Sequence, residues 1–172
     1  SAGTWSAATW SPQQPISAFE TTIVFNNASA ISSTANLGTL IGNKLNLTNA
    51  AVTLSGDSLF FLGTAPGITT TANAAHSIAN NLTLDGANTM NIASNTTTLS
   101  GVLNGGGGIT KTGAGTLVVT GANTNTGNTA VNAGVLNSRH ANALGSGDAT
   151  VARGAELQLQ GGITVGGRRV TV

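Results

Sequence analysis

The chain holds few side chains that could do acid–base, nucleophilic or metal-binding chemistry. Its two histidines, His76 and His140, lie in unrelated segments, and neither has a second histidine or an acid at metal-ligand spacing. The acids are Glu20, Asp57, Asp85, Asp148 and Glu156. We interpret both histidines as solvated turn residues and expect no metal and no cofactor.

Two catalytic arrangements stay open as alternatives. A Ser-His-Asp triad is assembled in space rather than in sequence, but no serine of this chain lies in a nucleophile-elbow motif. Asp57 and Asp85 each follow a leucine-rich strand and could share a face as paired carboxylates for glycoside cleavage. Turn positions explain the two aspartates more simply, so the sequence predicts no catalytic residues and no enzyme.

Two glycine-containing segments resemble binding loops but lack a required residue. Residues 105–112 are similar to a phosphate-binding loop, yet Thr110 stands where that loop needs a glycine before Lys111. Residues 145–151 are similar to one calcium-binding nonapeptide, an architecture that needs an aspartate on every turn. The chain has only three aspartates, so we expect neither phosphate nor calcium to bind.

The composition excludes further classes of protein. Of 172 residues only 6% are charged, against about 25% in an ordinary domain, and the net charge is +1. Binding to a nucleic-acid backbone needs several basic residues on one face, so no nucleic-acid partner is expected. There is no cysteine, which excludes disulfides and thiolate chemistry. Small polar residues replace the charges: Thr 27, Gly 24, Asn 19 and Ser 14.

These residue types predict an all-β fold, because they are poor helix formers and threonine favours strands. Leu-x-Leu or Leu-x-Val strands begin at residues 45, 82, 117 and 157, spaced by 37, 35 and 40 residues. Half of that spacing gives a repeating unit of about 20 residues, as in a parallel β-helix, or β-solenoid. Alternation predicts that Leu82, Leu84, Met90 and Ile92 face inward. A β-sandwich is the alternative, although its core usually carries more aromatic residues.

The two ends of the chain give further expectations. We divide the chain into residues 1–43, a capping unit with the first turns, and 44–172, the repeating turns of the β-helix. Trp5 and Trp10 could cover the open first turn, helped by Pro12 and Pro15, although tryptophans also stack on sugars. No signal peptide is visible, so Ser1 would be a mature end if the protein is exported. Strands are expected at 163–165 and 170–172, beyond which the chain either belongs to a longer passenger or stacks on another subunit. The basic pair before the last strand, Arg168 and Arg169, reads as a solvated corner.

One segment carries a specific motif. Residues 107–136 read GGITKTGAGTLVVTGANTNTGNTAVNAGVL. This segment closely resembles the passenger-associated transport repeat, or autotransporter-associated β-strand repeat, of type V secreted proteins. Two positions depart from the family pattern: Asn125 replaces the usual tyrosine and Asn128 replaces a common glycine. We expect the first change to remove an aromatic residue that covers the edge of a turn. The motif residues are Gly108, Thr110, Lys111, Thr112, Gly113, Gly115, Leu117, Gly121, Asn123, Gly127 and Gly134.

The resemblance implies a right-handed parallel β-helix in an autotransporter passenger, secreted or attached to the outer membrane of a Gram-negative bacterium. In that family the repeat is associated with outer-membrane passage and passenger folding, and the full-length protein is expected to carry an outer-membrane barrel. A stalk, adhesive scaffold or export-promoting segment is the predicted role. The alternatives are a fibre subunit that associates through its exposed ends and a solenoid that binds ice, or host or cell-surface glycans. Threonine triplets at 69–71 and 96–98 hint at the last.

Overall fold

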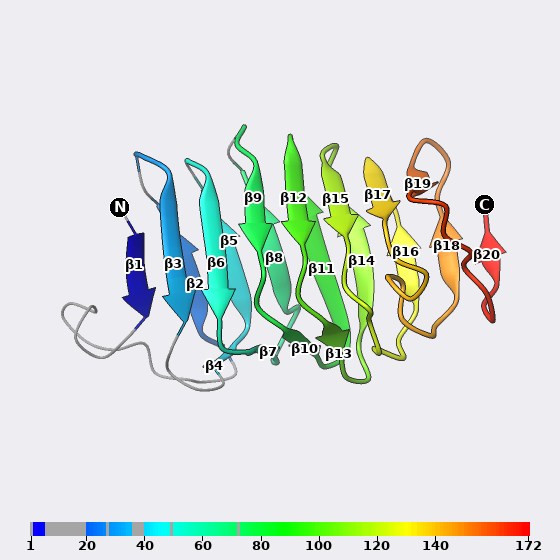
Figure 1. Cartoon of the computed structure of the whole chain (residues 1–172), viewed down its shortest axis with the longest axis horizontal. Coiled ribbons are helices and arrows are strands. Elements are labelled where there is room, and N and C mark those ends of the chain that lie inside the picture. Colours follow the sequence, from blue (N-terminus) through cyan, green and yellow to red (C-terminus); the bar gives the residue numbers. More distant parts are fainter. Residues whose placement is uncertain (1, 6–19, 27, 36–39, 49, 72) are drawn as a thin grey trace.

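The chain is built from strands stacked in parallel along one axis (Figure 1). The computed structural model describes residues 2–5, 20–26, 28–35, 40–48, 50–71 and 73–172. These residues form twenty strands in three sheets and no helix. Accordingly, the described part of the chain contains no helical segment of the length and apolarity that crossing a membrane requires.

The three sheets, named A, B and C, follow the order of the chain. Sheet A holds β1 (Ala2–Trp5), β3 (Ile31–Ala35), β6 (Val52–Gly56), β9 (His76–Ile78), β12 (Thr96–Leu99), β15 (Thr116–Val119), β17 (Val135–Ser138) and β19 (Glu156–Leu159). Sheet B holds β2 (Thr22–Phe25), β5 (Lys44–Leu47), β8 (Gly67–Thr70), β11 (Ala87–Ile92), β14 (Gly108–Thr112), β16 (Thr129–Val131), β18 (Ala149–Val151) and β20 (Val170–Thr171). Sheet C holds β4 (Leu40–Gly42), β7 (Leu59–Phe61), β10 (Leu82–Leu84) and β13 (Leu103–Asn104).

Each strand pairs with the equivalent strand one turn earlier and one turn later. Paired residues are 30 positions apart between β1 and β3, from Ala2 to Ser32. In all later pairings they are 19 to 24 positions apart, as from Thr116 to Val135 and from Thr53 to Ser77. Every pairing is parallel, so each turn of the chain forms one rung of a β-solenoid. The all-β, parallel solenoid with rungs of about 20 residues is therefore confirmed.

The grouping of the four leucine-rich starts into one repeat is wrong. Leu117 and Leu157 both lie in sheet A, two rungs apart. Leu45 lies in sheet B and Leu82 in sheet C. All three sheets bury one face and so share the same alternation, which is why the sequence pattern does not distinguish them.

The core is a set of inward-facing rows that run across the rungs. Leu82, Leu84, Met90 and Ile92 are all buried, as predicted. One row in sheet B runs through Leu45, Ile68, Met90, Lys111, Val131 and Val151. Burial of each large aliphatic side chain contributes roughly 1.5–3 kcal/mol. Stacking thus lets a chain with few aromatic residues exclude water from a continuous core.

The predicted strand at 163–165 does not form, whereas β20 occupies Val170–Thr171 within the predicted 170–172. Glycines in the left-handed region lie on both sides of it: Gly161 and Gly162 have φ of 97° and 66°, and Gly167 has φ of 74°. The turns that they form leave too short an extended segment to pair. Of the predicted cap residues, Trp5 ends β1 and Trp10 lies outside the described residues, as do Pro12 and Pro15.

Candidate functional site

The motif residues of the predicted repeat occupy one full rung and the corner of the next. Gly108, Thr110, Lys111 and Thr112 lie in β14, and Leu117 is buried in β15. Gly113 and Gly115 form the corner between these strands, and Gly134 lies between β16 and β17. Gly121, Asn123 and Gly127 lie in the irregular segment between β15 and β16. The motif residues therefore lie in β14, in β15 and in the segments that connect β14 to β17.

The motif glycines permit close contact between the backbones of neighbouring rungs. A Cβ atom at Gly108 would lie 2.2 Å from the carbonyl oxygen of Asn128, and one at Gly127 would lie 2.2 Å from the amide nitrogen of Gly108. The other four glycines of the motif would each bring a Cβ within 3.0 Å of a backbone atom in the preceding rung. Gly113 also has φ of 76°, which side chains disfavour. The glycine spacing of the motif thus follows from the stacking distance.

Asn123 joins three consecutive rungs. Its Oδ1 accepts a hydrogen bond from the backbone N–H of Leu103 at 2.8 Å, one rung earlier. Its Nδ2 donates to the carbonyl of Ala143 at 2.6 Å, one rung later. All three residues are buried, so water cannot reach these polar groups. Without Asn123, the N–H of Leu103 and the carbonyl of Ala143 would lose these hydrogen bonds.

Asn123 stands where sheet C ends. Its last strand, β13, contains Leu103, and the next rung places the irregular segment 120–128 against it. The backbone N–H groups of Thr124 and Asn125 donate to the Leu103 carbonyl, at 2.8 and 3.2 Å. The transport-type motif therefore terminates the third sheet and satisfies the hydrogen bonds of its final strand.

Asn125, which replaces the family's usual tyrosine, faces inward. Its side chain is fully buried, and its Nδ2 donates to the carbonyl of Gly107 at 3.3 Å. At this position the chain therefore has a buried amide that bonds to the neighbouring rung. An irregular segment has no two-residue alternation, so its sequence did not indicate which side chains point inward.

Lys111 is the largest of the fully buried side chains that the structure describes. It lies in the inward row of β14 between Met90 and Val131. Its Nζ donates to the carbonyls of Thr112 and Gly113, both at 2.8 Å, and of Ala133 at 3.1 Å. An ammonium group has three donors, and these carbonyls match all of them. The motif includes Lys111, but only the structure shows that its side chain points inward and bonds to carbonyls of two successive rungs.

Burial lowers the pKa of Lys111 from its usual 10.5 to about 8. Between these values the unfolded chain holds a proton that the folded chain has released, so stability rises with pH in this window. We expect the free energy of unfolding of the wild type to increase from pH 8 to 10, relative to a Lys111→Met variant, by at most about 1.4 kcal/mol per pH unit. Urea titrations of both proteins at several pH values measure this difference. A difference that stays constant over the window would contradict the prediction.

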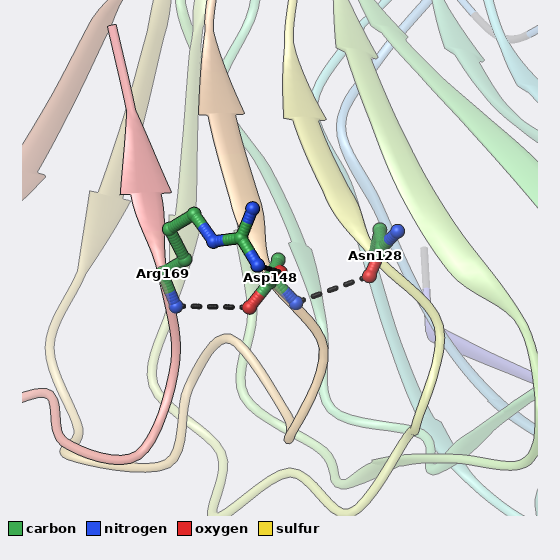
Figure 2. Close-up of polar contacts among 3 residues, drawn as sticks. All are labelled: Asn128, Asp148 and Arg169. Atoms are coloured by element: carbon green, nitrogen blue, oxygen red, sulfur yellow. Dashed lines mark hydrogen bonds and ion pairs between the residues drawn. The ribbon is translucent and has the colours of Figure 1, made fainter.

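Polar groups also follow one another at the corner before sheet B (Figure 2). The backbone N–H of Asp148 donates to Oδ1 of Asn128 at 3.1 Å, and the backbone N–H of Arg169 donates to Oδ1 of Asp148 at 2.9 Å. The Arg169 guanidinium lies 3.8 Å from the other carboxylate oxygen, with both side chains substantially exposed. Exposed pairs of this kind stabilise little. Asp148, the aspartate of the calcium-like segment, therefore accepts a hydrogen bond from the backbone of the next rung. Its partner, Arg169, belongs to the arginine pair that the sequence placed at a solvated corner.

His76 is not a solvated turn residue. It lies in β9, is 3% exposed, and accepts a hydrogen bond at Nδ1 from the backbone N–H of Val52 at 3.3 Å. Its Nε2 is buried without a partner among the described residues. The strand alternation places it in an inward row next to Thr97, which the isolated sequence did not reveal. His140, in contrast, lies beside the turn 141–144 and accepts from the N–H of Asn142 at 3.1 Å.

Burial lowers the pKa of His76 below 6.5. The unfolded chain then takes up a proton before the folded chain does, so stability is lost as pH falls below about 6.5. We expect this loss of stability between pH 6.5 and 5 to be smaller in a His76→Leu variant, because leucine does not titrate. Leucine suits the position, since Leu117 occupies the same inward row two rungs later. Thermal unfolding followed by circular dichroism at each pH tests this. Equal pH dependence in the two proteins would count against the assignment.

Asp57 and Asp85 lie at different corners of the solenoid. Asp57 follows β6 at the corner between sheets A and C, whereas Asp85 follows β10 at the corner between sheets C and B. The described part of the chain has no group of three histidines or acids that could hold a metal ion. The structure thus places the two aspartates as corner residues and does not pair them.

The comparisons with known proteins bear on the motif described above. The passenger-associated transport repeat matches residues 109–137. The adhesin BmaC autotransporter of Brucella suis biovar 1 (strain 1330) is 43% identical over 96 residues. That match covers 54% of this chain and 3% of the adhesin, so the chain spans a small part of the relative's length. No solved structure matches the chain.

The repeat, set in a parallel β-solenoid, defines the class: a segment of a secreted autotransporter passenger. Such passengers lie outside the cell or at the outer-membrane surface of Gram-negative bacteria. The Brucella adhesin is one such passenger, and this chain is similar to one portion of it.

Proposed function

We propose that this chain is a non-catalytic stalk segment of its passenger, and that residues 107–136 promote export by fixing successive rungs. The observation that carries the proposal is Asn123, whose side chain joins three rungs where sheet C ends. Lys111 fastens the same region from inside the core. A rung that closes in this way holds the preceding rung in place, which disfavours backward movement during secretion. An outer-membrane barrel elsewhere in the full-length protein is the proposed partner.

Deletions of a single rung test this role in the full-length protein. Ile109 pairs with Thr129, so removal of residues 109–128 joins the chain in register. Gly67 pairs with Thr89, so removal of residues 67–88 is a matched deletion outside the repeat. Both shorten the rod by one rung, roughly 4.8 Å. We expect surface display, measured by antibody labelling of intact cells, to fall several-fold for the first deletion and to change little for the second.

The two deletions distinguish a specific role from a general one. If both deletion proteins are displayed as well as the wild type, the repeat has no export role, and only the stalk role is kept. An equal loss in both would show that secretion requires any intact stack rather than this repeat.

A further inference from the structure

A polar groove lies on the outward face of sheet B. It crosses four successive rungs, β5, β8, β11 and β14, and has a volume of about 210 Å³. Pockets for drug-sized ligands measure roughly 300–1,000 Å³, so this one suits a single small ring. Six residues that line it are Lys44, Gly67, Thr69, Thr89, Asn91 and Thr112.

Gly67 creates the depression. It stands between Lys44 and Thr89 in the outward row of sheet B, where every other rung from β2 to β20 carries a side chain. A Cβ at Gly67 would lie 1.9 Å from the carbonyl oxygen of Thr89. Because no side chain fits there, the gap is a fixed feature of the stack.

The side chains around the gap have unused hydrogen-bonding capacity. Threonine hydroxyls, an asparagine amide and a lysine ammonium surround it, offering both donors and acceptors. Among the described residues, none of these side chains makes a hydrogen bond. Lys44 makes no ion pair within 4.0 Å, and its charge interacts at longer range with the Glu20 carboxylate. Other polar side chains of the corners, such as Asn43 and Asn123, are committed to neighbouring rungs.

The wall of the groove is held in a strained conformation. Ala65 lines the groove with φ of 55°, which is unusual for a residue other than glycine. Glu20 fixes the adjacent backbone, because its Oε1 accepts from the N–H of Thr64 at 3.0 Å and its Oε2 from Nδ2 of Asn43 at 2.6 Å. Strain that the surroundings maintain is a common property of ligand-binding sites.

We propose that this groove binds one acidic sugar unit, such as a uronic or sialic acid. The Lys44 ammonium pairs with the sugar carboxylate, and Thr69, Thr89, Asn91 and Thr112 bond its ring hydroxyls. Hydrogen-bonding side chains line the groove, and the one charged side chain among them, Lys44, is positive. This site goes beyond the export role and does not depend on it.

Titrations of the labelled protein by NMR test the site, with D-glucuronic acid and N-acetylneuraminic acid as probes and D-glucose as the neutral control. We expect saturable shifts at the backbone amides of residues 65–69 and 89–91 with at least one acidic sugar. Lys44→Gln should weaken the Kd about ten-fold, as for loss of a charge-assisted hydrogen bond. Thr89→Val should weaken it by a smaller factor.

A matched variant controls for general effects of removing a hydroxyl. Thr150 lies in the same outward row of sheet B, beyond the groove, so Thr150→Val should leave the Kd unchanged. The absence of saturable shifts with both acidic sugars at millimolar concentrations would overturn the proposal. So would equal binding of D-glucose, or unchanged affinity in folded Lys44→Gln, because either result removes the role of the carboxylate.

Discussion

Replacement of Asn123 by alanine is expected to lower the free energy of unfolding by about 3 kcal/mol. The substitution leaves the N–H of Leu103 and the carbonyl of Ala143 buried without the partners that Asn123 provides. Each orphaned buried group costs about 1–3 kcal/mol. The loss affects two interfaces between rungs at once, because one side chain serves both.

Urea unfolding followed by circular dichroism measures the global effect of this substitution. Hydrogen exchange measures the local one: the amide of Leu103 should exchange faster in the variant, because its acceptor is gone. Thr124→Ala is the matched control, since Thr124 is exposed and its side chain makes no hydrogen bond with the described residues. That control should stay within about 0.5 kcal/mol of the wild type. An Asn123→Ala protein as stable as the control would refute the bridging role.

Two alanine substitutions in the run Gly105–Gly108 should have opposite outcomes. At Gly108 a Cβ would meet the Asn128 carbonyl oxygen at 2.2 Å, so the next rung must move away. We expect Gly108→Ala to destabilise the protein by about 3 kcal/mol, at the upper end for overpacking. At Gly106 a Cβ would have no neighbour within 4 Å, and the backbone is compatible with alanine.

Gly106→Ala should therefore change stability by no more than about 1 kcal/mol, and in the stabilising direction, because alanine restricts the unfolded chain. Thermal unfolding of both variants gives the comparison directly. Similar melting temperatures for the two would contradict the view that backbone contact between rungs requires Gly108. The pair also separates contact from loop flexibility, since both variants remove a glycine from the same run.

The candidate site was only partly predictable from sequence. The motif at 107–136 was visible because its residues resemble a known repeat, and the matching family model covers nearly the same residues. The burial of Lys111, His76 and Asn125 was not visible. A polar residue at an inward position has the same letter as one at an outward position, and its direction depends on the register of its strand.

The outward-facing residues of the polar groove in sheet B were not predictable from the sequence either. The threonine triplets at 69–71 and 96–98 suggested a flat binding face, but Thr70 and Thr97 are buried in the core. The outward polar row instead combines residues more than twenty positions apart, such as Lys44, Gly67 and Thr89. Residues that are neighbours in this row are a full rung apart in the sequence, so no local sequence pattern predicts that they lie together.

The sequence by itself determined the fold class, because a chain rich in threonine, asparagine and glycine and poor in charge can exclude water by stacking short strands. The structure decided which glycines lie at close contacts between rungs, because Gly108 meets the next rung and Gly106 has open space. Only the tertiary structure decided which sheet each strand joins and where sheet C ends. It also decided which polar side chains, Asn123 and Lys111 among them, bond between rungs. The physical reason is that register between rungs is set by many backbone contacts acting together, whereas a sequence pattern reports only the alternation within one strand.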